Sequence, residues 1–256
     1  MRSANGLVIV SDMDGTLLNT DGRVPKANLD AINRFKQAGG RFTLASGRYG
    51  KALDRLFPEF REYVNAPAIL CNGAQLCDVL TGEIIREVKR SAREVMPMLY
   101  DLAERFPELE IHPIIKCGDS GKSIELCELS GGDECMKVVT GAEPEVLDRV
   151  REYFLQNYAS DWAESKSCKH LLEFLIPEAT KGQTLSHLRN HIKNTDGECK
   201  IIAVGDYEND IDMLLAADIA ACPENAVDRV KSISKIRLCY HNDGCIADLI
   251  NKIIDI

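Results

Sequence analysis

The feature that most constrains the fold is an alternation of apolar runs with amphipathic stretches, which occupies the first and the last third of the chain. Near the start, the apolar run at 7–10 is followed by a helical pattern at 25–40, which opens with proline and closes on two glycines. Further runs alternate up to residue 74, and the same order returns from residue 181 onward. Strands that alternate with helices in this way pair in parallel and are covered by the helices. The sequence therefore predicts an α/β fold with a Rossmann-like, doubly wound and mostly parallel sheet as its core.

The middle of the chain breaks this order. Residues 75–88 have the pattern of a hairpin that turns at Thr81 and Gly82. Two long helical patterns follow at 91–106 and 143–158, with strand patterns around them. Helices grouped with antiparallel strands form an α+β unit. We therefore predict that a smaller α+β cap domain, residues 81–178, is inserted into a core made of residues 1–80 and 179–256.

Charge limits the classes of function. The chain has 256 residues, of which 45% are hydrophobic, and its formal net charge is −9. A nucleic-acid binder would instead show a basic stripe, so we expect no nucleic-acid partner. An anionic substrate would need local positive charge from a metal ion, from lysines or from helix N-termini.

The sequence also favours one compartment. No apolar run approaches the ~18 residues of a membrane span, and residues 1–6 lack the apolar region of a secretion signal. Ten scattered cysteines without a C-x-x-C pair favour reduced thiols over a zinc site. We expect a cytoplasmic protein without a membrane partner, and the sequence leaves its oligomeric state open.

Polar residues gather where the predicted strands end. Ligands of open α/β sheets bind beyond the carboxyl ends of the strands, so these positions are the first candidates for a site. The residues at these ends are Asp12, Asp14, Ser46, Gly47, Arg48, Asn72, Asp206, Asn209 and Asp210. Lys181 joins them, because Thr180 and Gln183 have the spacing of a capping box and place the lysine in the first turn of a helix.

These residue types point to phosphoryl transfer. Four carboxylates would converge and, without a cation, would raise one another's pKa. They are Asp12, Asp14, Asp206 and Asp210. Oxygen-rich sites of this kind suit Mg²⁺, and Ser46, Lys181 and Asn209 can donate to phosphate oxygens. Alone, "DMDGT" could also open a Ca²⁺ loop, but a strand precedes it and Arg23 stands where that motif needs Glu.

The ordered set of motifs resembles the haloacid dehalogenase superfamily of phosphatases. "DMDGT" at 12–16 matches the D-x-D-G-T motif of that family, and "TLASGR" matches the second motif with Ser46 at the strand end. "TKG" matches the third with Lys181, and "GDYEND" at 205–210 matches the fourth, G-D-x-x-x-D. The insert lies after Ser46, as in type II caps, and its two junctions resemble the Cof-like, type IIB subgroup. "ACPENA" at 221–226 departs from the sequence usual in relatives.

The resemblance implies roles for these residues. Asp12 would be the nucleophile that forms an aspartyl phosphate, and Asp14 would protonate the leaving group and then activate water. Mg²⁺ would be held by Asp12, Asp14 through its backbone carbonyl, and Asp206, with Asp210 as an anchor or support. The phosphoryl group would be held by Ser46, Gly47, Lys181 and Asn209. Thr16 would shape the turn, and Arg48 and Asn72 would face the cap or serve as structural contacts.

Three functions remain open at this stage. The first is a Mg²⁺-dependent phosphatase acting on a small phosphorylated metabolite, such as a sugar phosphate. One alternative is a phosphomutase of the same superfamily, because phosphomannomutases resemble this chain in cap type and first motif. The other is a non-catalytic regulator that binds phosphate or metal. We expect cap loops to select the substrate, with the polar stretches 116–123 and 130–136 as candidates. For Glu173 two orientations are open, into the site or toward solvent, and we expect it to face solvent.

Overall fold

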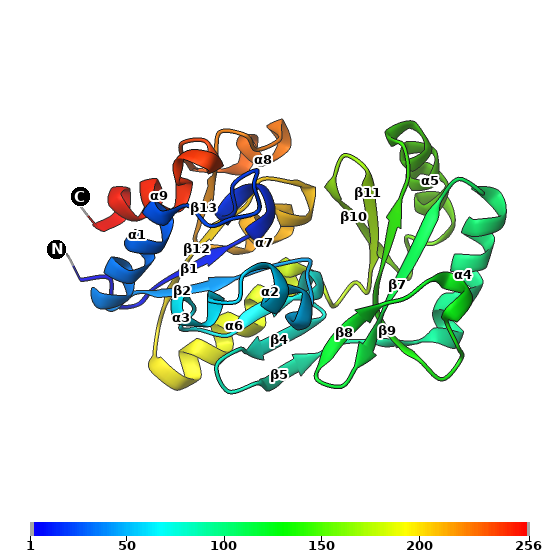
Figure 1. Cartoon of the computed structure of the whole chain (residues 1–256), viewed down its shortest axis with the longest axis horizontal. Helices are drawn as coiled ribbons and strands as arrows, with labels where there is room; N and C mark the ends of the chain where they lie inside the picture. The colour runs from blue at the N-terminus through cyan, green and yellow to red at the C-terminus, as the bar shows by residue number, and fades with distance from the viewer. Residues whose placement is uncertain (1–2, 255–256) are drawn as a thin grey trace.

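The computed structural model, which describes residues 3–254, has two lobes that lie side by side (Figure 1). The lobe with both termini holds a five-stranded parallel sheet, in the order β14-β13-β12-β1-β2. Its strands are β1 (Leu7–Ser11), β2 (Arg41–Leu44), β12 (Lys200–Val204), β13 (Ile219–Cys222) and β14 (Ile236–Arg237). The predicted parallel α/β core is therefore confirmed.

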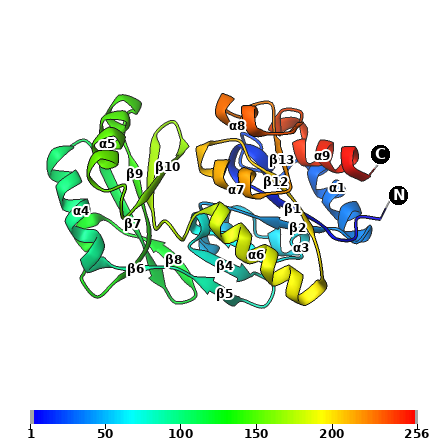
Figure 2. The same ribbon diagram turned by 180° about the vertical axis from the view of Figure 1, so that it is seen from behind.

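Helices cover both faces of this sheet. One face packs against α1 (Lys26–Gln37), α2 (Gly50–Leu56), α3 (Phe60–Tyr63) and α9 (Cys245–Ile254). The other packs against α6 (Lys181–Asp196), α7 (Ile211–Ala216) and α8 (Asp228–Ile233). Figure 2 views the molecule from the side opposite to Figure 1 and shows these helices. In β1, Ile9 enters the first apolar cluster whereas Val8 and Val10 enter the second. A strand buried on both faces needs an unbroken apolar run, which is why β1 shows no polar alternation.

A small antiparallel sheet connects the two lobes. It contains β3 (Ala68–Leu70), β4 (Gln75–Asp78) and β5 (Glu83–Glu87), in that order. A single bridge between Ala45 and Ile69 joins it to β2, and Ile85 of β5 packs with the second apolar cluster of the core lobe. Through these contacts the whole predicted hairpin belongs to the core side. The predicted domain boundary at residue 80 would instead divide the hairpin between the two domains. The chain enters the second lobe after Glu87.

The second lobe is an antiparallel sheet with two helices on its outer face. Its strand order is β10-β11-β9-β7-β8, and β6 pairs with β9. The elements are β6 (Arg90–Ser91), α4 (Ala92–Arg105), β7 (Glu110–Cys117), β8 (Ser120–Ser123), β9 (Glu134–Gly141), α5 (Pro144–Asn157), β10 (Ala163–Cys168) and β11 (Leu171–Leu175). Figure 1 shows α4 and α5 on the side away from the core. The opposite face of the sheet is therefore left to meet the core.

All ten cysteines carry free thiols. Within residues 3–254, no helix combines the length and apolarity that a membrane crossing needs. The 3-10 turns of the chain include Cys71–Gly73 and Glu208–Asp210, and both lie beside the site described below.

The core of the second lobe depends on a stacked aromatic pair. Phe154 of α5 and Phe174 of β11 are fully buried, with ring centroids 4.3 Å apart. We expect Phe154→Ala to lower the free energy of unfolding by about 3–5 kcal/mol, because it removes a buried ring and leaves a cavity. Leu155→Ala, at the next position where the side chain is 50% exposed, should change it by less than about 0.5 kcal/mol. Denaturant titration compares the two, and equal losses would contradict this packing.

Candidate functional site

The carboxyl ends of the parallel strands meet at the edge of the core that faces the second lobe. β1 leads into Asp12, β2 leads through Ala45 into Ser46, and β12 leads through Gly205 into Asp206. Asp12 and Ser46 are held by ladder-like bonds, since the Asp12 amide donates to Val204 O at 2.8 Å and the Ser46 amide to Ile69 O at 2.8 Å. The sheet itself therefore fixes the backbone of the site.

A buried lysine links these strand ends. Lys181 begins α6, where the Thr180 hydroxyl accepts a hydrogen bond from the Gln183 amide at 3.3 Å. Its Nζ donates to Asp12 Oδ1 at 2.6 Å and to Asp210 Oδ1 at 2.7 Å. Burial lowers the pKa of Lys181, but the two carboxylates raise it by more, so the pKa lies above its ordinary value and the ammonium stays charged.

Three carboxylates lie around this one ammonium, and two of them accept hydrogen bonds from it. Asp12, Asp206 and Asp210 each bring an oxygen within 4.8 Å of the others. Burial, with Asp210 as the next cause, raises the pKa of Asp12 well above its ordinary value. The same two causes raise the pKa of Asp206 to about 7, although Thr16 Oγ1 donates to its Oδ1 at 2.7 Å. An excess of buried negative charge with oxygen donors fits a hard divalent cation such as Mg²⁺.

Asp210 braces the cluster. Its Oδ1 accepts from Lys181, and its Oδ2 accepts from the amides of Asp206 at 2.9 Å and Tyr207 at 3.3 Å. Because both oxygens are already engaged, the geometry supports the expected anchoring role better than direct coordination of the cation.

The first loop has room only for glycine at residue 15. Gly15 has φ = 79°, and a Cβ there would lie 2.4 Å from Asp206 Oδ2. Asn225 holds this loop from the other side, since its Nδ2 donates to Gly15 O at 2.8 Å. Sequence reasoning gave Asn225 no role. Its segment, 221–226, also braces Asp206, because the Val227 amide that follows donates to Asp206 O at 2.9 Å.

The Asp14 carboxylate lies outside the cluster. Arg48 donates two hydrogen bonds to it, from Nε to Oδ2 at 2.9 Å and from Nη2 to Oδ1 at 2.8 Å. Both side chains are about half exposed. An exposed pair of this kind is worth only ~0–1 kcal/mol, so Asp14 can leave Arg48 at little cost.

A cavity of about 410 Å³ lies between the core and the second lobe. From the core it is lined by Asp12, Asp14, Gly47, Arg48, Tyr207 and Asn209, and from the second lobe by Lys137, Val139, Ser167, Cys168, Leu171 and Glu173. Ser46, Lys181, Asp206 and Asp210 lie buried behind Asp12. Thr16 and Asn72 are likewise buried, against Asp206 and Glu173. The structure therefore brings the predicted residues together around one cavity or directly behind its wall.

The second lobe contributes two charges, of which sequence reasoning missed Lys137 and preferred solvent for Glu173. Lys137 of β9 and Glu173 of β11 form a buried ion pair, and Glu173 Oε2 also accepts from Asn72 Nδ2 at 2.9 Å. The expectation that Glu173 faces solvent was wrong, because the core covers this face of the sheet. The stretches 116–123 and 130–136 do not line the cavity. A lone charge within each of two apolar strand runs, "MKVV" and "LLEFL", was the available signal.

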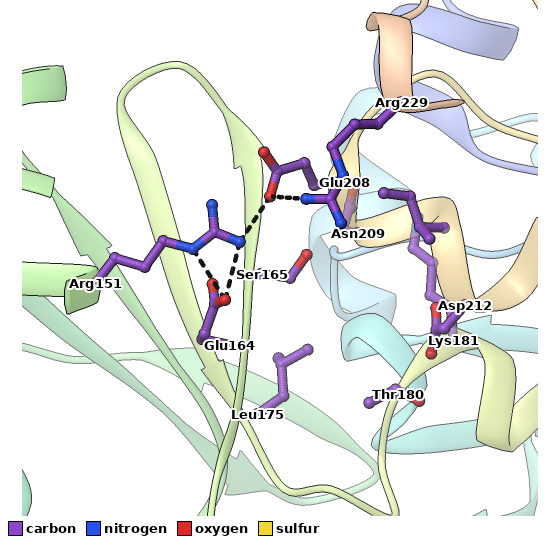
Figure 3. A pocket seen from close by; sticks show the side chains of 11 residues that line it. Arg151, Glu164, Ser165, Leu175, Thr180, Lys181, Glu208, Asn209, Asp212 and Arg229 are labelled. Carbon is purple, nitrogen blue, oxygen red and sulfur yellow. Dashed lines mark hydrogen bonds and ion pairs between the residues drawn. The ribbon is translucent and has the colours of Figure 1, made fainter. Parts of the chain in front are cut away.

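A second contact between the lobes lies next to the site (Figure 3). Arg151 of α5 donates through Nη2 to Glu208 Oε2 at 2.9 Å and through Nε to Glu164 Oε1 at 2.9 Å. Arg229 of α8 approaches Glu208 at 3.7 Å. These residues line a cavity of about 260 Å³ that also reaches Lys181 and Asn209. Glu208 stands between Asp206 and Asp210 in the chain, so the second lobe is tied directly to the loop that carries both.

Comparisons with known proteins cover both lobes. The model of the haloacid dehalogenase-like hydrolase family matches residues 9–119 and 119–250. The chain is 26% identical over 241 residues to the HMP-PP phosphatase of Yersinia pseudotuberculosis, covering 86% of this chain and 84% of that one. It is 25% identical over 272 residues to the chloroplast endoribonuclease YBEY of Arabidopsis thaliana, covering 95% of this chain but spanning only 46% of that protein. The solved HAD subclass IIB sugar phosphatase BT4131 has a TM-score of 0.78 at 17% identity, with 96% of this chain and 98% of that one covered.

The acidic cluster predicts a pH-dependent response to Mg²⁺. The pKa of Asp206 rises from its ordinary 3.8 to about 7 on folding. Between about pH 4 and 7 the folded protein therefore keeps a proton on Asp206 that the unfolded chain has lost, so the free energy of unfolding falls as the pH rises through this range. A cation that pairs with the carboxylate should remove this loss. We expect Mg²⁺ to raise the melting temperature more at pH 8 than at pH 5.5, measured by calorimetry. Asp206→Asn should weaken the response at pH 8, and equal shifts in the wild-type protein at both pH values would contradict the expectation.

The contact between the lobes predicts a coupling energy. Arg151 and Glu208 are 25% and 21% exposed, so their pair is screened less than a surface pair. A double-mutant cycle with Arg151→Ala and Glu208→Ala should give a coupling of about 1 kcal/mol in the free energy of unfolding. The same cycle on Lys193 and Glu198, which are 55% and 80% exposed, serves as the control. A coupling no larger than that of the control would contradict the proposed tie between the lobes.

Proposed function

This chain belongs to the haloacid dehalogenase-like hydrolase family, and from that premise we propose that it is a Mg²⁺-dependent phosphatase acting through an aspartyl-phosphate intermediate. The observation that carries the proposal is the position of Asp12, which opens onto the cavity while Lys181 and two further carboxylates lie behind it. A carboxylate held by one ammonium on one oxygen is oriented for attack with the other.

The proposed reaction has two steps. In the first, an Asp12 oxygen bonds to phosphorus, the ester P–O bond breaks, and Asp14 gives its proton to the departing alkoxide. In the second, Asp14 takes a proton from water, the water oxygen bonds to phosphorus, and the bond from phosphorus to Asp12 breaks. Inorganic phosphate leaves and the Asp12 carboxylate is restored. Asp14 must leave Arg48 for this, which its half-exposed position allows.

The other site residues would bind and orient the phosphoryl group. Ser46, the amide of Gly47, Lys181 and Asn209 supply donors from separate segments. Asp12, the backbone carbonyl of Asp14, and Asp206 would hold Mg²⁺, with Asp210 as their support. The ion would neutralise charge on the phosphoryl oxygens. The second lobe, as a cap over residues of the core, would exclude water from the cavity.

The substrate class follows from the size of the cavity and from the relatives. About 410 Å³ suits a small metabolite and excludes a folded phosphoprotein. Two of the similar proteins are named as phosphatases of HMP-PP and of sugars, so we propose sugar phosphates as the first class to test. The cytoplasm is the location we expect, since such metabolites are found there.

The activity can be tested directly. We expect the wild-type protein to release phosphate from 4-nitrophenyl phosphate and from sugar phosphates with Mg²⁺, and to lose this activity with a chelator. Asp12→Asn should lower kcat/KM by at least about a thousandfold, because it removes the nucleophile. Asp30→Asn, on an exposed face of α1, is the matched control and should leave the rate unchanged.

The same assay separates the other hypotheses. Activity retained in Asp12→Asn would contradict the assignment of the nucleophile. Isomerisation of a sugar phosphate without release of phosphate would indicate a mutase. Binding of phosphate esters with no turnover would indicate a regulator.

A further inference from the structure

The buried ion pair between Lys137 and Glu173 has no role in the two chemical steps. Both side chains are only 4% exposed, and both line the cavity. A buried ion pair is seldom more stabilising than apolar side chains of the same size. Stability therefore does not explain why the cap places charges at this point, whereas contact with a polar ligand would.

The pair lies next to the proposed phosphoryl site. A Cβ built on Gly47 would be 3.5 Å from Lys137 Nζ and 3.0 Å from Asn72 Oδ1. Gly47 belongs to the loop proposed to hold the phosphoryl group. Lys137 therefore lies where the alcohol part of a phosphate ester would begin.

Asn72 connects the pair to that loop under visible strain. Cys71 and Asn72 have φ values of 52° and 56°, in a region that residues other than glycine seldom adopt. The Asn72 amide donates to Ser46 O at 3.0 Å, and its side chain donates to Glu173. Among residues 3–254, Asn72 Oδ1 is one of two buried side-chain polar atoms without a hydrogen-bond partner. The left-handed backbone at Cys71 and Asn72 places the unpartnered Oδ1 of Asn72 beside Gly47, which indicates a positioning role.

The charges of the cavity wall restrict the ligand. Every cation among its lining residues is already paired with an acid, Lys137 with Glu173 and Arg48 with Asp14. The other lining residues beyond Asp12 are uncharged. Arg48, which Asp14 must release during the reaction, belongs to the loop proposed to hold the phosphoryl group. A second phosphate or a carboxylate at the Lys137–Glu173 end of the cavity would therefore meet Glu173 without a free cation. Hydroxyl groups would instead find a donor in Lys137 and an acceptor in Glu173.

We propose that Lys137 and Glu173 are specificity-determining residues that bind the alcohol part of the substrate, and that they select phosphate monoesters of uncharged, hydroxylated alcohols over esters that carry a second phosphate. Asn72 is the positioning residue that connects this pair to the Ser46–Gly47 loop. The inference rests on the proposed phosphatase function and deepens it.

Selectivity among three substrates tests the inference. The probes are a hexose 6-phosphate, the corresponding hexose 1,6-bisphosphate and 4-nitrophenyl phosphate, which has no hydroxyl group on its alcohol part. The wild-type protein should prefer the monophosphate to the bisphosphate by about tenfold or more in kcat/KM. Glu173→Gln keeps the shape of the side chain and leaves Lys137 as a free cation, so the preference should fall by about tenfold.

The double variant Lys137→Met/Glu173→Gln removes both charges and avoids a buried charge without a partner. It should lower kcat/KM for the hexose monophosphate at least about ten times more than for 4-nitrophenyl phosphate. Lys166→Met is the matched control, because Lys166 is a mostly buried cap lysine, 12% exposed, whose partner Asp148 lies on α5. It should leave all selectivity ratios within about twofold, and circular dichroism should show every variant folded.

The outcomes distinguish the two proposals. An equal loss on all substrates in the double variant, or an unchanged ratio of monophosphate to bisphosphate in Glu173→Gln, would overturn the specificity role. The phosphatase function would survive that result as long as Asp12→Asn still abolished hydrolysis of 4-nitrophenyl phosphate. No release of phosphate by the wild-type protein from any of the three esters would overturn both proposals.

Discussion

The structure depends on one buried ammonium. Lys181 is fully buried and holds Asp12 and Asp210 at once, and Asp12 lies 169 positions away in the chain. Removing Lys181 would leave two buried carboxylates without their cation, and breaking a buried pair in this way costs about 3–5 kcal/mol in comparable cases. The ends of β1 and β12 and the start of α6 must therefore meet at one point. This requirement fixes where the chain can return after the insertion.

The two ends of the insertion satisfy that requirement by touching. Gly73, just after β3, lies so close to the returning chain that a Cβ would be 2.2 Å from Thr180 O. Thr184 Oγ1 donates to Gly73 O at 2.7 Å. Arg86 Nη2 of β5, one residue before the chain enters the second lobe, donates to Glu178 O of the returning chain at 2.9 Å. The exit and the return therefore lie next to each other, close to the start of α6. A domain of about ninety residues can be inserted there, because its two ends join the core at neighbouring positions and leave the core strands in place.

The sequence was enough to predict which core residues meet at one edge of the sheet, and physical reasons explain what it did not predict. Asp12, Ser46 and Asp206 could be grouped without coordinates because parallel strands end at one edge. The cap offered no such rule. β9, the central strand of the cap sheet, carries Lys137 amid apolar residues and was not expected as a strand. Glu173 was assigned to solvent because alternation in one strand does not show whether its polar face will be covered by another domain. The hairpin of β4 and β5 was found, but its membership of the core depends on the long-range contact of Ile85 with the α6 side of the sheet.

The contacts between the lobes have a common form. One runs from Arg151 to Glu208, between Asp206 and Asp210, and the other runs from Glu173 to Asn72, beside Ser46. Both are polar, and polar interfaces between domains open more readily than apolar ones. The first ends two residues from Asp206, and the second ends on Asn72, whose backbone amide donates to Ser46 O at 3.0 Å. A single movement of the cap would therefore break both contacts together, so these two core loops meet the charged groups of the cap only when the cap lies as it does here.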